Sequence, residues 1–399
     1  MVDFRQSFKK AHEKGITPAV SAHLDAIRGL AAIAVLLMHA RHLLLRDWAD
    51  LHHHNLGLEF VYGITEFGHQ AVIVFFILSG FFIGPGVLRD IHTGRWSFTA
   101  YFVKRFIRLE IVLLPALLLC LFWDLSGSHI FGLKSIYGGH ADFYPVAYNI
   151  QACISAPIFF GNLAFLQMIK VPPLGSDSPL WSLANEFWYY LLFPCTALAL
   201  LSRKKLAVRS TYGGAGVLIV WLVRKSILIY FPIWLIGVLS YYLPKTKHPK
   251  SIKRAFLIAS SVLFCLDLLS TKQYWSNSIA SDYVLSGCFA LFLYSLLNRT
   301  TTIGERYSRL SHGLASSSYT LYVVHLPLLV FLEVWIGKRW VPTPLHLVLT
   351  LGIVYTDWLY ARGIYRLFEA RTPTVRQWTE KKLKGLYAKM GRKERQGVL

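Results

Sequence analysis

The chain has 399 residues, of which 54% are hydrophobic and only 16% are charged, and its mean hydropathy is +0.44. Soluble domains average about 25% charged residues, so this composition excludes an ordinary soluble enzyme and indicates a polytopic α-helical membrane protein. The net charge of +21 does not indicate a nucleic-acid partner, because the basic residues gather in alternate segments between the hydrophobic stretches.

Ten apolar segments predict an all-α bundle of about ten transmembrane helices. They are 24–45, 67–84, 106–127, 179–201, 211–223, 227–243, 255–270, 280–297, 313–337 and 345–367. With this assignment, 31 of the 42 lysines and arginines fall on one side, which also holds both termini. By the positive-inside rule that side is the cytoplasm.

The segments divide the chain into three parts: a basic cytoplasmic N-terminal segment (1–23), a membrane domain (24–368) and a basic cytoplasmic tail (369–399). The first part contains no apolar core with a cleavage site, so we expect the first hydrophobic helix to be retained. The apolar piece 150–168 contains Pro157, Gly161 and Asn162, and counting it as a span would move the basic residues 203–205 to the outside. We therefore expect it to be re-entrant or packed against the outer face.

Metal and disulfide chemistry is not indicated. The five cysteines lie in or near apolar segments without C-x-x-C spacing, which predicts packing residues. The histidine run 52–54 lies in a loop and lacks the fixed geometry that a metal site needs, so we expect no metal and no tightly bound cofactor.

The first span carries two ionisable residues, Arg28 and His39, eleven positions apart. At about 1.5 Å and 100° per residue they share one helix face and stand about 16 Å apart. His39 would lie near the middle of the membrane, where an ionisable side chain is costly unless it has a function. Asp25, three residues before Arg28, is placed to pair with it.

Three further polar groups lie in apolar surroundings. Arg105 and Arg108, three residues apart at the cytoplasmic start of the third span, suit phosphate oxygens or simply mark the membrane interface. Glu186 lies among aromatic residues, and His325 lies in a late span; each alone is compatible with a structural role. Together with His39 they predict a polar site inside the bundle.

These residues belong to motifs that occur in a fixed order, and the chain resembles the acyltransferase-3 family of integral-membrane O-acyltransferases. The motifs are L-D-x-x-R-G-L-A at 24–31 with R-x10-H ending at His39, F-F-I-L-S-G-F at 75–81, R-x-x-R at 105–108, W-S-L-x-x-E at 181–186 and S-Y-x-x-Y-x-x-H-x-P at 318–327. Ile73 departs from the pattern, since many relatives have a polar residue there, and this would alter the polarity of a pocket.

The resemblance implies transfer of an acyl group, usually acetyl, from an acyl-CoA co-substrate to a hydroxyl of a glycan. Arg105 and Arg108 would then hold coenzyme A phosphates, and Arg28 would bind donor phosphate or stabilise developing charge. His39 would act as the base or as a transient acyl carrier, with Glu186 and His325 orienting His39 or the acceptor.

The predicted partners are therefore an acyl-CoA, a carbohydrate or lipid-linked acceptor and membrane lipids, in the inner (plasma) membrane of a bacterium. A different interpretation, a proton-coupled transporter or flippase of a glycan or lipid-linked sugar, also requires buried His, Glu and Arg side chains. It does not require the R-x-x-R pair at a cytoplasmic helix start.

Overall fold

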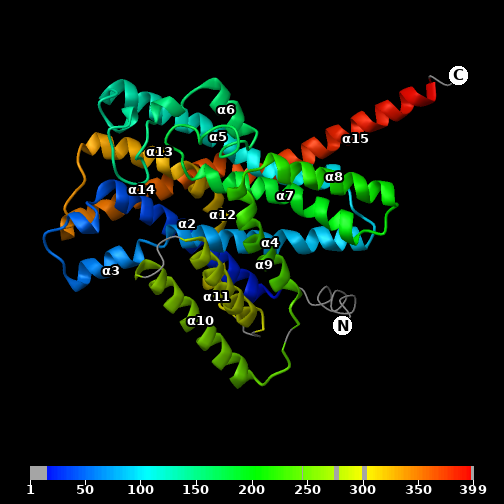
Figure 1. Cartoon of the computed structure of the whole chain (residues 1–399), viewed down its shortest axis with the longest axis horizontal. Coiled ribbons are helices and arrows are strands. Elements are labelled where there is room, and N and C mark those ends of the chain that lie inside the picture. The colour runs from blue at the N-terminus through cyan, green and yellow to red at the C-terminus, as the bar shows by residue number, and fades with distance from the viewer. Residues whose placement is uncertain (1–15, 245, 274–277, 299–302, 397–399) are drawn as a thin grey trace.

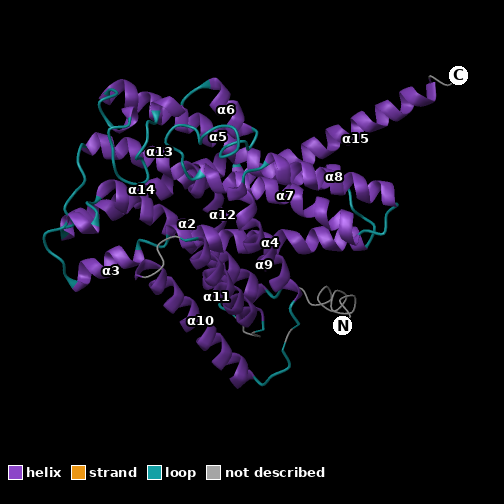
Figure 2. Ribbon diagram, viewed as in Figure 1, coloured by secondary structure: helices purple, strands orange, loops and turns teal. Residues whose placement is uncertain are grey.

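A computed structural model describes residues 16–244, 246–273, 278–298 and 303–396, and within these ranges the chain is helical with no strand beyond two isolated bridges (Figures 1 and 2). The long helices are α2 (Pro18–Leu44), α4 (Gly68–His92), α5 (Phe98–Phe131), α7 (Leu180–Leu201), α8 (Leu206–Leu222), α9 (Lys225–Tyr242), α10 (Lys250–Gln273), α11 (Ile279–Leu297), α12 (Glu305–Ser316), α13 (Ser318–Ile336), α14 (Pro344–Leu367) and α15 (Thr372–Gln396). Short helices are α3 (Leu56–Ile64) and α6 (Ala156–Leu163).

Each of the ten predicted spans is largely helical, so the all-α membrane bundle is confirmed. In the described chain, six helical segments are long and apolar enough to cross a bilayer. They are α2, the stretch 56–92 that contains α4, α5, α9, α11 and α13. The count of ten spans and the cytoplasmic termini stay predictions.

Two boundaries differ from the sequence prediction. The predicted span 313–337 is interrupted at Ser317, where α12 ends and α13 begins. The apolar piece 150–168 forms only the eight-residue helix α6, after which Phe165 and Met168 adopt positive φ angles of 54° and 66°. Eight residues rise about 12 Å, which is too short to cross a hydrocarbon core of about 30 Å.

The predicted tail is not a separate segment at its start. A short 3-10 helix (Glu369–Arg371) follows α14 and leads into α15, whose first part packs against α5 and whose later part projects from the bundle (Figure 1). The prediction for residues 1–15 lies outside the described chain, and α2 begins at Pro18, inside the predicted N-terminal segment.

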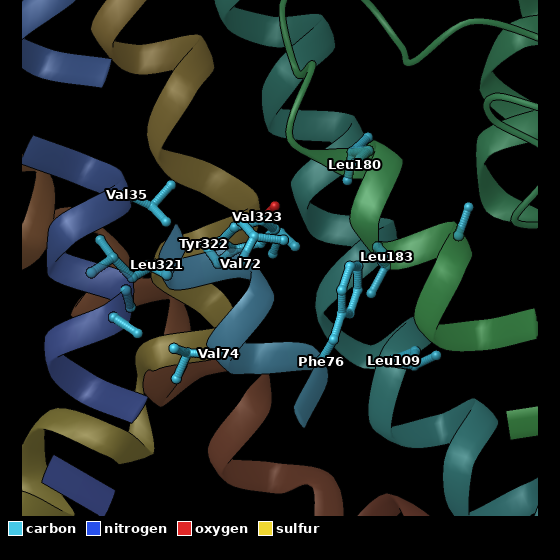
Figure 3. Close-up of a cluster of buried hydrophobic side chains, with 14 of the residues drawn as sticks. Val35, Val72, Val74, Phe76, Leu109, Leu180, Leu183, Leu321, Tyr322 and Val323 are labelled. Atoms are coloured by element: carbon cyan, nitrogen blue, oxygen red, sulfur yellow. The ribbon is translucent and has the colours of Figure 1, made fainter. Parts of the chain in front are cut away.

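One part of the core lies where five helices meet (Figure 3). Side chains from α2, α4, α5, α7 and α13 pack together there, with α13 in contact with both α2 and α5. α13 contributes an almost continuous run of buried residues from Ser318 to Phe331. The predicted site residues therefore lie on helices that pack against one another.

Two motif glycines allow this close packing. A Cβ on Gly80 would lie 1.9 Å from the carbonyl oxygen of Trp234 on α9, and a Cβ on Gly29 would lie 2.5 Å from the Cβ of Leu314 on α12. Small residues at such contacts let helix backbones approach closely in membranes. The obstacle at Gly80 is backbone, so it cannot rotate away.

Gly80→Ala should therefore destabilise the bundle by about 1–3 kcal/mol or more, because the added methyl group overpacks the contact between α4 and α9. Gly86→Ala on the same helix is the matched control, since a Cβ there meets nothing within 4 Å. Thermal unfolding in detergent should show a lower Tm for Gly80→Ala alone. Equal Tm values for the two variants would contradict the packing argument.

Candidate active site

A cavity of about 210 Å³ lies between α2, α4, α5, α7 and α13. All five motifs contribute residues to it or contact those that do. Its polar lining includes four of the six predicted site residues, and these are Arg28, Arg105, Arg108 and Glu186. Ile73, the departure from the family pattern, is fully buried and does not line this cavity.

The three arginines differ in their partners. Arg28 donates to the carbonyl oxygen of Ala315 (3.1 Å) and lies 3.8 Å from the Asp25 carboxylate, as the spacing predicted. Arg105 lies over the rings of Tyr101 and Tyr190, and among the described residues no carboxylate pairs with it. Its guanidinium is therefore the most available cation in the cavity wall.

Arg108 is already paired, which the sequence did not predict. Its Nη1 lies 2.6 Å from Oε1 of Glu369, which begins the short 3-10 helix after α14. Glu369 also accepts from the backbone N–H (3.2 Å) and the hydroxyl of Thr320. Glu369 is buried although it stands at the start of a basic tail. Its signal in the sequence was weak: a single acidic residue two positions after the last predicted span.

Glu186 is held at the cavity by neighbouring hydroxyl groups. Ser79 donates to its Oε1 (2.8 Å), and Tyr190 donates to the same oxygen. Ser79 in turn accepts from the indole N–H of Trp234 (3.1 Å). In the described chain no hydrogen bond joins Glu186 to His39, so its position favours contact with a cavity ligand over orientation of His39.

His39 and His325 form a buried hydrogen-bonded pair. Nδ1 of His39 lies 2.7 Å from Nε2 of His325, and the rings are stacked with centroids 5.0 Å apart. Nδ1 of His325 lies 3.0 Å from the carbonyl oxygen of Leu321, one helical turn earlier on α13. Two residues 286 positions apart in the chain therefore meet, and the orienting role of His325 stays a prediction.

This arrangement fixes the tautomers. A carbonyl oxygen can only accept, so Nδ1 of His325 carries the hydrogen and its Nε2 has the lone pair. Nδ1 of His39 must then donate to that lone pair, which leaves Nε2 of His39 as its basic nitrogen. The hydroxyl of Tyr144 lies 3.2 Å from this nitrogen.

The histidine pair and the cavity are separate but adjacent. His39 and His325 do not line the cavity, whereas Tyr322, one turn before His325 on α13, does. The Tyr322 hydroxyl is 2.7 Å from that of Ser182, and its ring centroid is 6.3 Å from that of His325. Tyr322 therefore forms part of the wall between the arginines and the histidines.

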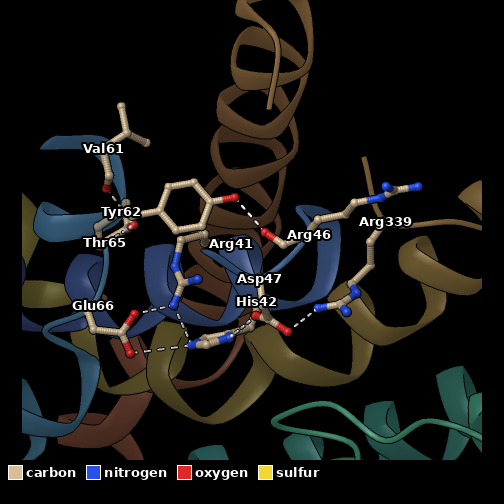
Figure 4. Close-up of polar contacts among 9 residues, drawn as sticks. All are labelled: Arg41, His42, Arg46, Asp47, Val61, Tyr62, Thr65, Glu66 and Arg339. Atoms are coloured by element: carbon tan, nitrogen blue, oxygen red, sulfur yellow. Dashed lines mark hydrogen bonds and ion pairs between the residues drawn. The ribbon is translucent and has the colours of Figure 1, made fainter. Parts of the chain in front are cut away.

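A second polar cluster, unpredicted from the sequence, lies at the C-terminal end of α2 (Figure 4). Arg41 pairs with Glu66 and donates to Nε2 of His42 (2.6 Å), whose Nδ1 donates to Asp47 (3.2 Å). Asp47 also accepts from Arg339 (2.6 Å), before α14. Arg41 and His42 come from the last turns of α2, and Asp47, Glu66 and Arg339 come from segments that were predicted to lie outside.

Known proteins similar to the chain are acyltransferases. A family model described as an acyltransferase domain matches residues 21–358. An "O-acetyl transferase" of Shigella phage Sf6 is 23% identical over 308 residues, which cover 76% of this chain and 83% of that protein. "O-acetyltransferase OatA" of Staphylococcus aureus is 21% identical over 371 residues, which cover 86% of this chain. The chain spans little more than half of OatA, 56% of its length, and no solved structure matches significantly.

Arg108→Ala should destabilise the protein, because it leaves the buried Glu369 carboxylate without its cation; about 1–3 kcal/mol is expected. Arg105→Ala removes no ion pair and should leave the Tm nearly unchanged. Thermal unfolding of both variants in the same detergent measures the difference. A Tm loss in Arg105→Ala that equals the loss in Arg108→Ala would contradict the assigned pairing.

Proposed function

The chain belongs to the acyltransferase family, and we propose that it transfers an acetyl group from acetyl-CoA to a hydroxyl of a cell-surface or lipid-linked glycan at the bacterial inner membrane. The observation that carries this proposal is the buried pair of His39 and His325, which leaves a basic nitrogen facing a hydroxyl group. The names of the relatives support acetyl as the transferred group.

The cavity suits the phosphate-bearing part of the donor. It presents three guanidinium groups, and guanidinium forks bind phosphate oxygens with strong charge-assisted hydrogen bonds. In this proposal Arg105 binds phosphate first, because no carboxylate in the described ranges pairs with it, and Arg28 assists. Arg108 stays paired with Glu369 and contributes positive potential.

The distance between the two polar sites fits an extended donor. Arg28 and His39 are eleven residues apart on α2, which corresponds to about 16 Å along the helix axis. A donor anchored by its phosphates among the arginines must extend a long arm past Tyr322 to bring a thioester to His39. Oε1 of Glu186 is used by two hydroxyl groups, so its second oxygen is left to accept an amide N–H of that arm.

Nε2 of His39 is the general base in this mechanism. It takes the proton of the acceptor hydroxyl as the oxygen forms a bond to the acyl carbon, and the C–S bond then breaks. The departing thiolate receives the proton from Nε2, which restores the neutral ring. His325 holds His39 in the required tautomer throughout, because its Nε2 lone pair needs the hydrogen on Nδ1 of His39.

Transfer of radiolabel from acetyl-CoA to membrane glycan tests the proposal. His39→Gln should reduce transfer by about 10²–10⁴-fold, the usual contribution of a general base, whereas His346→Gln, at a half-buried histidine that bonds the carbonyl oxygen of Val341, should not. Label on the protein in the absence of acceptor would assign His39 as an acyl carrier instead. Undiminished transfer by His39→Gln would exclude the mechanism, and glycan transport without acyl transfer would favour the flippase interpretation.

Arg105→Gln should raise the KM for acetyl-CoA by about 10- to 100-fold, because it removes a charge-assisted phosphate contact. Lys104→Gln is the matched control, because it removes the same positive charge from the neighbouring residue. Lys104 is exposed and does not line the cavity. Steady-state kinetics with varied donor measures both. An unchanged donor KM for Arg105→Gln would contradict phosphate binding in the cavity.

A further inference from the structure

Tyr144 combines an exposed ring with a contact to a buried catalytic nitrogen. The residue is 53% exposed, and it lies in the loop between α5 and α6. His39 is only 3% exposed, yet the Tyr144 hydroxyl lies 3.2 Å from its Nε2. The tyrosine hydroxyl therefore stands between His39 and the face that the topology assigns to the outside.

The direction of this hydrogen bond follows from the tautomers. Nε2 of His39 has the lone pair, so the tyrosine hydroxyl is the donor. Although much of the residue is exposed, its hydroxyl points to the buried His39, and desolvation raises the pKa of Tyr144 to about 12, which keeps the proton in place and makes the hydroxyl a poor nucleophile. Before transfer, an acceptor hydroxyl must donate a hydrogen bond to the base over about 2.6–3.2 Å, and the Tyr144 hydroxyl has this geometry.

We propose that the Tyr144 hydroxyl occupies the acceptor-hydroxyl position on His39, and that the acceptor enters from the exposed face of this loop by displacing it. The inference rests on the proposed function, since it assigns an occupant to the base named there. The acceptor would then reach His39 from the side opposite to the donor cavity, which contains Arg28 near the other end of α2.

The surroundings of Tyr144 suit a polyhydroxylated acceptor. Its ring meets that of His42 edge-on at 5.3 Å, and the neighbouring Phe143 ring lies under the Arg339 guanidinium at 4.1 Å. The Asp47 and Glu66 side chains of the polar cluster in Figure 4 are 34% and 37% exposed. The exposed Tyr144 ring beside partly exposed carboxylates offers both a stacking surface and the acceptor oxygens that sugar rings use.

The placement also explains how the donor is protected before the acceptor arrives. A thioester beside an uncovered base would be hydrolysed by water, and excluding water is one function of closing an active site. With the Tyr144 hydroxyl on Nε2, a water molecule has no place at the base. Removing the side chain should therefore convert the protein into an acetyl-CoA hydrolase.

The test measures release of free coenzyme A from acetyl-CoA by the full-length protein in detergent without acceptor. Tyr144→Ala should raise this hydrolysis by about 10-fold, and Tyr144→Phe, which keeps the ring, by about 2- to 10-fold. Tyr148→Phe is the matched control on the same loop, because its hydroxyl donates to the carbonyl oxygen of Gly175 and not to His39. Adding His39→Gln to Tyr144→Ala should abolish the gain.

Hydrolysis that is unchanged or lower in both Tyr144 variants would overturn the inference, and so would a gain that survives His39→Gln. A parallel assay of label transfer to membrane glycan separates the two proposals. If the wild-type protein transfers label in a His39-dependent way while the Tyr144 variants hydrolyse no faster, only the placement of the acceptor fails. If the wild-type protein transfers no label, the proposed function fails.

Discussion

The hydrogen bond between His39 and His325 is the interaction on which the rest of the site depends. A polar group inside a bundle must be hydrogen-bonded, and each imidazole here satisfies the other. The carbonyl oxygen of Leu321 must accept from Nδ1 of His325, so Nε2 of His325 accepts from Nδ1 of His39. Nε2 of His39 is then left as the basic nitrogen. Because α2 and α13 carry the two rings, the packing of these helices sets the geometry of the pair.

α2 connects this pair to the two surfaces of the protein. Arg28 lies three turns before His39 and faces the arginine cavity, while His42 lies one turn after it and joins the outer polar cluster. The close contact at Gly29 holds α12 against α2, and the close contact at Gly80 holds α9 against α4. In the proposed mechanism the donor and acceptor sites thus lie toward opposite ends of α2, with the base between them.

Hydropathy predicted the helices because each apolar segment must satisfy its own backbone in a membrane. The three-residue spacing also predicted the pairing of Asp25 with Arg28, since this contact is local. Contacts set by the tertiary fold were not predictable: Glu369 reaches Arg108 from 261 positions away, and Tyr144 meets His39 from an irregular loop without periodicity. The break at Ser317 was missed because the residues on both sides are equally compatible with one long helix.

An experimental structure with a bound non-hydrolysable acetyl-CoA analogue would test the proposed mechanism most directly. It should show phosphate oxygens at Arg28 and Arg105 and the acyl carbon within about 4 Å of the place held by the Tyr144 hydroxyl, beside Nε2 of His39. A donor whose acyl group ends beside Glu186, with His39 and His325 unchanged behind Tyr322, would contradict it.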